Sequence, residues 1–465
     1  MLLSLDGSPE GHGSEHNMND TRKKSLVDLG VEALADALLK LAARDDMADD
    51  LVDRIIATPS ENIKRFKAKL SAIKRSRRFI RWGESAGFSR ELESVLEELK
   101  EGVDDPKTGA ELASAFYETD KGALGNCDDS SGLVGNVYRY YARELFVEYA
   151  QRCTDKEWLT NLVFKLNRTD DYGVRDALIH CAAEYLPETN IRTLIDRFQE
   201  AAVKGSEEYG KRHWYLLIES LARQIKDARL FEKTRIASWG TQSTAACADI
   251  AKVYLECGDA HTALSWLERI PAAETFHTYD RDRLLFDIHQ QLGETEKMIE
   301  VAWRIFRRYR SKDSLEELLA VLGDERRDAV MNGELDLILK SKALSLSDAA
   351  FLMELNRTDE AEHYLLDRAD QLNGDLYGSL LPLAEGMEDA ERLLAATVII
   401  RALLDSILRR CQTKTYPHGV RYLKKLDRLA KSVSDWSGFE DHDTYMRQLL
   451  QNHGRKSSFW SKYRS

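Results

Sequence analysis

The sequence predicts an all-α protein, built as an α-solenoid of short helical hairpins with non-repeat helical flanks. Apolar residues recur at spacings of three and four along nearly the whole chain, and strand-like alternation is absent. Prolines are few, and Pro59 and Pro106 follow Thr58 and Asp105, the arrangement that starts a helix. A helix–turn–helix plan also repeats at an interval near 35 residues.

The repeat is recognised by its breaks. In each copy one helix ends and a second begins at once. The breaks are Gly258-Asp259, Gly293-Glu294 and, in a weaker third copy, Asn356-Arg357. Helical hairpins at this period are typical of tetratricopeptide-like solenoids, which bind partners along stacked helices.

Changes in composition along the chain predict five segments. They are a disordered tail (1–19), an N-terminal helical region with a basic amphipathic helix (20–117), a middle helical region (118–240), the tetratricopeptide-like repeats (241–410) and a C-terminal helical cap (411–465). Pro382 predicts a break or kink within the repeat segment.

Several classes of site are excluded by missing motifs. HExxH, GxxxxGK[ST] and GxGxxG do not occur, so neither a metal nor a cofactor is expected. His442 and His453 share a helical face but would lie about 16 Å apart, too far to hold one ion.

The six cysteines form no CxxC pair, and no apolar run reaches membrane-spanning length. These features predict a cytoplasmic protein.

A basic stretch is the first candidate for function. The chain carries a net charge of −12, yet nine basic residues and no acid lie between Lys64 and Arg81. Apolar residues within it fall on one face, which predicts an amphipathic helix over 61–81. The candidate interaction face comprises Lys64, Lys67, Lys74, Arg75, Arg77, Arg78 and Arg81.

This face has three interpretations. The favoured one is pairing with the acidic residues between Glu91 and Glu101 of the same chain. The second is nucleic-acid binding, driven by the release of counterions from phosphates. The third is contact with an acidic protein or a membrane surface.

Two short motifs resemble functional sites but are not expected to perform that chemistry. Gly83–Gly87 matches GxSxG, but no strand precedes it, so a nucleophile elbow is not expected. The loop from Cys127 to Gly132 fails as a calcium loop, because position six from Asn126 is not glycine. Its Asp and Ser residues are instead expected to cap the following helix.

The C-terminal segment is basic and aromatic. Phe459, Trp460 and Tyr463 could cover the last apolar face of a solenoid, or could form an exposed docking peptide or interfacial anchor. The cap is the favoured interpretation.

Together these stretches resemble an uncharacterised bacterial family of large helical proteins, over nearly the whole chain from about residue 20. The resemblance rests on FIRWGESAGFSRELESVLEELKEG, the DDSSG loop, the Gly-Asp repeat and the closing HxxYxxxLxxxHxRKxxFW pattern. The N-terminal half is also similar to the helical region accompanying SWIM zinc fingers. Their CxC and CxH pairs are missing, so zinc and DNA binding do not carry over. The family-motif positions, of unknown role, are Asp128, Asp129, Ser130, Gly132, His442, Tyr445, His453, Arg455, Lys456 and Trp460.

The sequence therefore predicts a non-catalytic protein–protein interaction scaffold whose partner is an unknown protein or peptide. The alternatives are a nucleic-acid-associated protein that binds through residues 64–81, and an enzyme with an unrecognised site.

Overall fold

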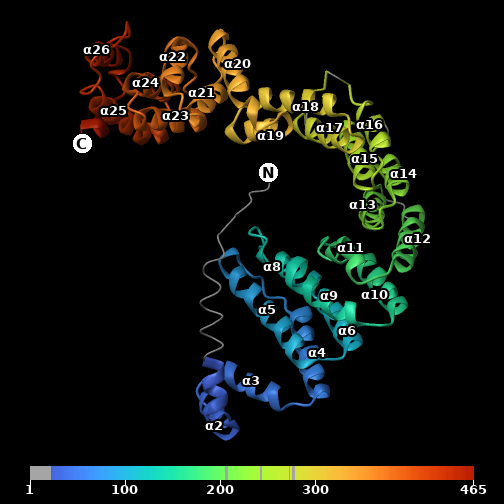
Figure 1. Cartoon of the computed structure of the whole chain (residues 1–465). Helices are drawn as coiled ribbons and strands as arrows, with labels where there is room; N and C mark the ends of the chain where they lie inside the picture. Colours follow the sequence, from blue (N-terminus) through green and yellow to red (C-terminus); the bar gives the residue numbers. More distant parts are fainter. Residues whose placement is uncertain (1–21, 205–207, 241–242, 272, 275–277, 465) are drawn as a thin grey trace. The chain divides into compact units, whose positions relative to one another are not determined.

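The computed structural model describes residues 22–204, 208–240, 243–271, 273–274 and 278–464 (Figure 1). The predicted tail, 1–19, lies outside them. The all-α prediction is confirmed, because the only strand-like pairing within these ranges is an isolated parallel bridge between Ile80 and Cys127. No helix in the same ranges is long and apolar enough to cross a membrane. The chain divides into two compact units, Met1–Cys257 and Gly258–Ser465.

Helices make up most of the described part of unit 1. Its α-helices are α2 (Val31–Ala42), α3 (Asp46–Ile56), α4 (Pro59–Arg75), α5 (Ser85–Gly102), α6 (Pro106–Tyr117), α7 (Asp120–Gly125), α8 (Leu133–Asn136), α9 (Arg143–Arg152), α10 (Lys156–Arg168), α11 (Asp176–His180), α12 (Glu188–Lys204), α13 (Glu208–Gln224), α14 (Ala228–Trp239) and α15 (Thr244–Glu256). Shorter elements are the 3₁₀ turns η1 (Trp82–Glu84) and η3 (Ala182–Glu184), and the π-helical stretch η2 (Val137–Ala142) that joins α8 to α9.

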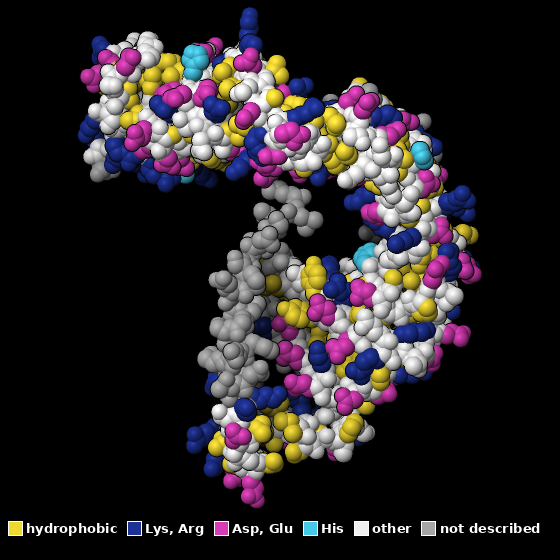
Figure 2. Space-filling model, viewed as in Figure 1, with side chains coloured by type: hydrophobic (Ala, Val, Ile, Leu, Met, Phe, Trp, Pro, Cys, Tyr) yellow, Lys and Arg dark blue, Asp and Glu magenta, His cyan; other side chains and the backbone are white. Residues whose placement is uncertain are grey.

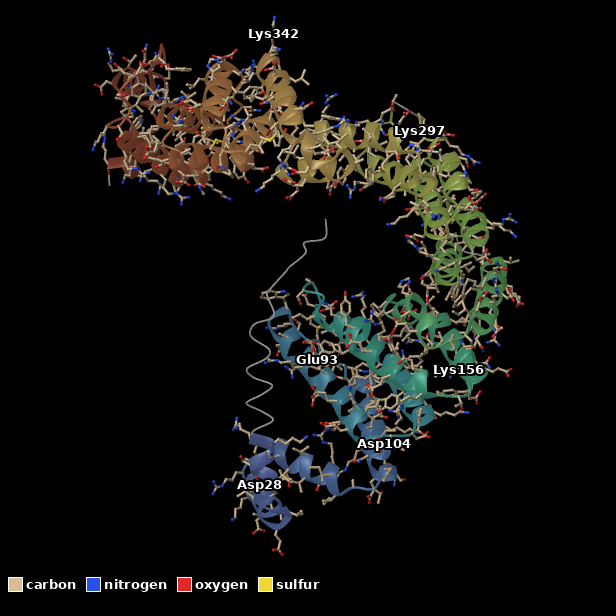
Figure 3. The ribbon with its side chains drawn as sticks, viewed as in Figure 1. Asp28, Glu93, Asp104, Lys156, Lys297 and Lys342 are labelled. Carbon is tan, nitrogen blue, oxygen red and sulfur yellow. The ribbon has the colours of Figure 1, made fainter. Side chains whose placement is uncertain are left out.

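Helix starts in unit 1 follow the sequence signals. Thr58 and Glu61 form a reciprocal cap, since the backbone N–H of Thr58 donates to Glu61 Oε2 at 2.8 Å and Thr58 Oγ1 accepts from the Glu61 N–H. Asp105 accepts from the Thr108 N–H at 2.8 Å ahead of α6. Lys156, labelled in Figure 3, lies at the start of α10 and donates its Nζ to the Ala150 carbonyl near the end of α9, at 2.8 Å.

Two packing patterns meet in unit 1. From α12 to α15 each helix packs on its neighbour in the chain, whereas among the earlier helices some contacts join elements that are not neighbours, such as α6 with α9 and α5 with α8. The early core contains Phe116, Tyr138 and Phe146, all fully buried. A buried bidentate ion pair from Arg175 to Asp120 (2.7 and 2.8 Å) ties the residue preceding α11 to α7. This part is therefore a helical bundle with non-local contacts.

Helices also make up most of the described part of unit 2. Its helices are α16 (Ala260–Leu267), α17 (Thr278–Leu292), α18 (Thr295–Arg308), α19 (Lys312–Leu322), α20 (Arg327–Lys340), α21 (Leu346–Glu354), α22 (Thr358–Leu366), α23 (Tyr377–Asp389), α24 (Leu393–Arg410), α25 (Tyr416–Leu429), α26 (His442–His453) and α27 (Ser457–Arg464), with 3₁₀ turns η4 (Asp324–Arg326), η5 (Ala369–Gln371) and η6 (Thr413–Thr415). Chain neighbours pack together in the series α16–α19, in the pair α21–α22 and in the series α23–α25.

The three predicted repeat breaks are real helix breaks. Gly258, Gly293 and Asn356 adopt positive φ angles of 88°, 71° and 57°, and each lies between two helices of its copy. Glycine suits this conformation because it lacks Cβ, and asparagine tolerates it better than most residues. In the second copy Lys297, labelled in Figure 3, donates to Glu294 Oε1 at 2.9 Å and supports the start of α18.

Positive-φ breaks between helices also occur at positions that the sequence did not predict. Lys226, Gly323 and Glu391 also have positive φ, and with the predicted breaks they form a series separated by 32, 35, 30, 33 and 35 residues. Gly240, which ends α14, is the one further positive-φ residue described between Lys226 and Glu391. Lysine and glutamate rarely adopt this conformation, so sequence alone did not reveal two of these breaks.

One sequence prediction about helices is wrong. The basic helix does not extend over 61–81: α4 ends at Arg75, and Ser76 already has extended geometry, with φ −59° and ψ 125°. The cause is a tertiary contact, since Ile80 pairs with the Cys127 segment instead of continuing the helix. At Pro382 a break or kink was predicted; α23 is not broken there and runs through it from Tyr377 to Asp389.

Candidate functional site

The nine basic residues divide between α4 and an extended segment that follows it. Lys64, Arg65, Lys67, Lys69, Lys74 and Arg75 lie on α4, whereas Arg77, Arg78 and Arg81 lie beyond it. Residues 76–82 are called the basic arm below. As predicted, one face of α4 is apolar: Phe66 and Leu70 are buried, and Ile73 packs beside them.

Some of this charge is neutralised within the chain. Lys69 Nζ donates to Glu98 of α5 at 2.7 Å, and Lys74 Nζ donates to Glu118 at 2.9 Å. Arg65 pairs with Asp53 and Arg78 with Glu84. Of the acidic residues predicted as partners between Glu91 and Glu101, only Glu98 pairs with the basic stretch in the described part of the chain. The intramolecular interpretation therefore accounts for part of the charge.

The side chains of the remaining basic residues form no ion pair in the described ranges. They are Lys64, Lys67, Arg75, Arg77 and Arg81, and all five are exposed. Figure 2 shows Lys and Arg interspersed with Asp and Glu over the visible face of each unit, so runs of one sign are not the rule for this protein.

Two sequence motifs meet at the basic arm. The Ile80 N–H donates to the Asn126 carbonyl at 2.8 Å, and the Asp128 N–H donates to the Ile80 carbonyl at 2.9 Å. Asn126 Nδ2 also donates to the carbonyl of Ser76, at 3.3 Å. The DDSSG loop thereby holds the arm by backbone pairing, a contact between residues nearly fifty positions apart.

The loop acts as a helix cap, as its residue types predicted. Asp129 uses both carboxylate oxygens, accepting from the N–H groups of Val134 (2.9 Å) and Gly135 (2.8 Å) at the start of α8. Asp128 Oδ1 accepts from the Ser130 N–H at 3.3 Å and from its hydroxyl at 2.5 Å. Gly132 has φ 74°, which only glycine adopts without strain. These contacts give the four loop positions a structural role.

The inner side of the basic arm borders a groove of about 860 Å³. Its lining comes from α4, α5, α7 and the arm, and includes Lys69, Ile73, Ser76, Arg78, Ile80, Phe88, Arg90, Glu91, Val95, Glu98 and Asn126. Apolar side chains are thus mixed with charges of both signs.

In unit 2 the closing motif is an internal network. His442 Nε2 lies 2.9 Å from Asp427 Oδ1, and the Tyr463 hydroxyl donates to Asp427 Oδ2 at 2.6 Å. Trp460 is buried and donates its Nε1 proton to the His453 carbonyl at 2.9 Å. Phe459, fully buried, contacts the rings of Tyr416 and Trp460 edge-on. The segment is folded onto the unit and is not an exposed docking peptide.

Two further motif positions lie at the edge of this network. Lys456 Nζ lies 2.8 Å from the Sγ atom of Cys411, the residue that ends α24. Arg455 is exposed, and its side chain has no hydrogen bond or ion pair in the described part of the chain.

Arg401 of α24 and Tyr445 of α26, both buried, lie beside the carboxyl group of Asp405. The Tyr445 hydroxyl donates to Asp405 Oδ1 at 2.7 Å, and the guanidinium carbon of Arg401 lies 4.4 Å from the Tyr445 ring centre. Burial raises the pKa of Asp405 and lowers that of Arg401. Arg401 Nη1 donates to the Glu440 carbonyl at 2.8 Å, whereas its Nε and Nη2 have no partner among the described residues.

A hollow of about 410 Å³ adjoins this buried cluster. It is lined by residues that include Asp370, Arg401, Asp405, Ser406, Arg409 and Phe439. Because both signs of charge line it, its chemistry selects neither an anion nor a cation.

A third concavity lies on the repeat. Helices α17, α18 and α19 enclose a groove of about 400 Å³, with Phe286, Met298, Ala302, Ile305, Leu318 and Val321 as its apolar lining. Its polar lining residues include Arg283 and Glu317, which pair at 2.5 Å, and Gln290. Met298 occupies the position that Ala263 and Ala361 fill in the other copies.

Comparison with known proteins gives one family. The model of a family of unknown function (DUF6880) matches residues 16–247 and 236–462, almost the entire chain. The protein belongs to the DUF6880 family. No curated protein and no solved structure matches it. The predicted uncharacterised family is therefore confirmed. The similarity to SWIM-associated regions and the bacterial origin stay predictions.

The GxSxG match in this DUF6880 protein has a structural explanation. Ser85 of the GxSxG match is buried at the start of α5, and its hydroxyl donates to the Trp82 carbonyl at 2.7 Å. A 3₁₀ turn, not a strand, precedes it. Within the described residues no group of His, Cys, Asp and Glu side chains is arranged to hold a metal ion.

The partners of the closing motif are the residues that sequence reasoning missed. Arg401, Asp405 and Asp427 belong to α24 and α25 and lie outside the motif itself. The signal for the first two was available: they are a charged pair at i, i+4 spacing inside the apolar run LLAATVIIRALLDSIL.

Proposed function

We propose that this protein is a non-catalytic interaction scaffold, an α-solenoid of tetratricopeptide-like hairpins that binds other proteins. The observation that carries the proposal is the apolar groove between α17, α18 and α19. The groove would hold a helical or extended segment of a partner protein, and the central side chains of that segment would be apolar.

The groove has the composition of a peptide site. Apolar side chains such as Phe286, Ile305 and Leu318 form most of its lining, and the Arg283–Glu317 pair provides polar groups. An apolar centre surrounded by a polar rim is the usual anatomy of a protein interface. An amphipathic segment can place its apolar face in such a groove.

The regular breaks support the repeat on which the proposal depends. Positive-φ breaks at intervals of 30–35 residues between Lys226 and Glu391 divide this stretch into units of nearly constant length. Repeats of this kind present one face of successive helices to a ligand.

A groove-blocking variant of the full chain tests the proposal. Ala320 is exposed within the groove, whereas Ala329 is exposed on α20 outside it. A partner captured from lysate and identified would be titrated, as its purified binding segment, against wild type, Ala320→Arg and the matched control Ala329→Arg. We expect Ala320→Arg to weaken binding at least about tenfold, which is about 1.4 kcal/mol, and Ala329→Arg to leave it unchanged.

Two results would overturn the assignment. One is the absence of any partner above a control with a scrambled sequence. The other is equal binding by both arginine variants, because the groove would then not be the binding surface.

A further inference from the structure

The basic arm has two different sides. An extended chain points successive side chains in opposite directions. Ser76, Arg78 and Ile80 line the 860 Å³ groove, so these even-numbered residues face inward. Arg77, Phe79 and Arg81 do not line it, and the alternation places them together on the outer side.

This outer side combines positive charge with an exposed ring. Phe79 is 58% exposed, and Trp82 at the end of the arm is 65% exposed. Arg77 and Arg81 are exposed, and neither side chain forms an ion pair in the described part of the chain. Residues two apart in an extended chain are separated by about 6.6 Å, so the backbone positions of Arg77 and Arg81 lie one on each side of Phe79 along the arm.

The nearby acidic groups are already engaged. Glu84 accepts from Arg78 through Oε1 and from the Arg81 backbone N–H through Oε2. Asp129 accepts from two N–H groups of α8, and Asp128 accepts from Ser130. Glu84 senses the charge of Arg81, but none of these carboxylates forms an ion pair with the Arg77 or Arg81 side chain in the described part of the chain.

The arm is also held in place before any ligand arrives. Two backbone hydrogen bonds join Ile80 to the Asn126–Asp128 segment, and Asn126 holds the carbonyl of Ser76. Ligand binding therefore need not order this backbone, which lowers the entropic cost of association.

From these observations we infer that the Arg77–Phe79–Arg81 face binds single-stranded nucleic acid. Phosphates would contact the two arginines, and an unpaired base would stack on Phe79. A duplex offers no unstacked base to an isolated ring. An acidic protein segment would satisfy the arginines but would leave the exposed ring without a specific role.

Fluorescence anisotropy with full-length protein tests this inference. The probes are a labelled 12-nucleotide single strand of mixed sequence, the same sequence as a duplex, and a poly-glutamate peptide as competitor. We expect the single strand to bind more tightly than the duplex, and poly-glutamate to compete weakly. Phe79→Ala should weaken single-strand binding about 5- to 100-fold, and Phe79→Leu should weaken it nearly as much, because leucine cannot stack.

The charge contribution has its own matched variants. Arg77→Ala/Arg81→Ala should reduce the slope of log K against log salt by about 1.4, since each phosphate contact on a single strand contributes about 0.7. Lys165→Ala/Arg168→Ala removes the same charge from exposed positions of α10 and should leave affinity and slope unchanged.

Three results would overturn the inference. The first is no binding of the single strand at low salt. The second is equal binding of single strand and duplex with Phe79→Ala unaffected, which would indicate general attraction to phosphate. The third is competition by poly-glutamate as strong as that of unlabelled single strand, which would assign the face to an acidic protein.

Discussion

Two stretches of similar composition, one in each unit, lie in opposite environments. Arg75–Trp82 and His453–Tyr463 both mix basic and aromatic residues. In the first, Phe79 and Trp82 are mostly exposed. In the second, Phe459 is 0% and Trp460 is 5% exposed. Composition alone therefore does not distinguish a surface that is available to a ligand from one that completes a core.

Backbone conformation explains the difference. The C-terminal aromatic residues lie on α27, which packs on α25, so Phe459 and Trp460 face the core of unit 2. The basic arm is extended, and the bridge to Cys127 leaves every second side chain pointing outward. Stability should therefore depend on the C-terminal aromatics, and ligand binding on the arm.

Truncation of the two phenylalanines should give the largest contrast. Phe459→Ala removes a fully buried ring and should lower the free energy of unfolding by about 3–5 kcal/mol. Phe79→Ala removes an exposed ring and should change it by no more than about 0.5 kcal/mol. Urea unfolding followed by circular dichroism measures both, and similar losses in the two variants would refute the comparison.

Loss of the Tyr445 hydroxyl should have the next largest effect. Tyr445→Phe removes the hydrogen bond that this buried hydroxyl donates to the Asp405 carboxylate, which should lower the free energy of unfolding by about 1–3 kcal/mol. Tyr422→Phe is a matched control, because its half-buried hydroxyl has no hydrogen bond in the described part of the chain. If both variants unfold at the same urea concentration, the Tyr445–Asp405 contact does not stabilise unit 2.

Removal of the loop cap should destabilise unit 1 more modestly. Asp129→Ala leaves the N–H groups of Val134 and Gly135 without their acceptor. The substitution should lower the free energy of unfolding by about 0.5–2 kcal/mol. Asp129→Asn retains an acceptor and should cost less. Hydrogen exchange at these two amides would report the change, and unchanged protection in Asp129→Ala would show that the cap is dispensable.

The smallest effect concerns His453. Burial, and then the charge of Lys456, lower its pKa below the ordinary 6.5. The imidazole therefore binds a proton more readily in the unfolded chain than in the folded one. As a result, the free energy of unfolding decreases as pH falls through 6.5. His453→Gln should show a weaker fall in stability between pH 7.5 and 5.5 than wild type. An identical fall in both proteins would contradict this assignment.

The sequence predicted local features better than tertiary ones. Apolar periodicity and caps such as Thr58 were sufficient for the helical class, and the break residues Gly258 and Gly293 were readable because glycine favours positive φ. The end of α4 could not be predicted from the sequence, because it depends on the pairing of Ile80 with a segment nearly fifty residues away. Asp427 was missed for the same reason: its role appears only when α25, α26 and α27 come together.

A paired measurement on two aromatic residues tests the central contrast most directly. Phe79→Ala and Trp460→Ala would each be assayed for the unfolding midpoint and, under conditions where both proteins are folded, for single-strand affinity. The account predicts that Phe79→Ala loses affinity and keeps its midpoint, whereas Trp460→Ala has a lower midpoint and keeps its affinity. If the two properties change together in both variants, the division between a binding arm and a structural C-terminal segment is contradicted.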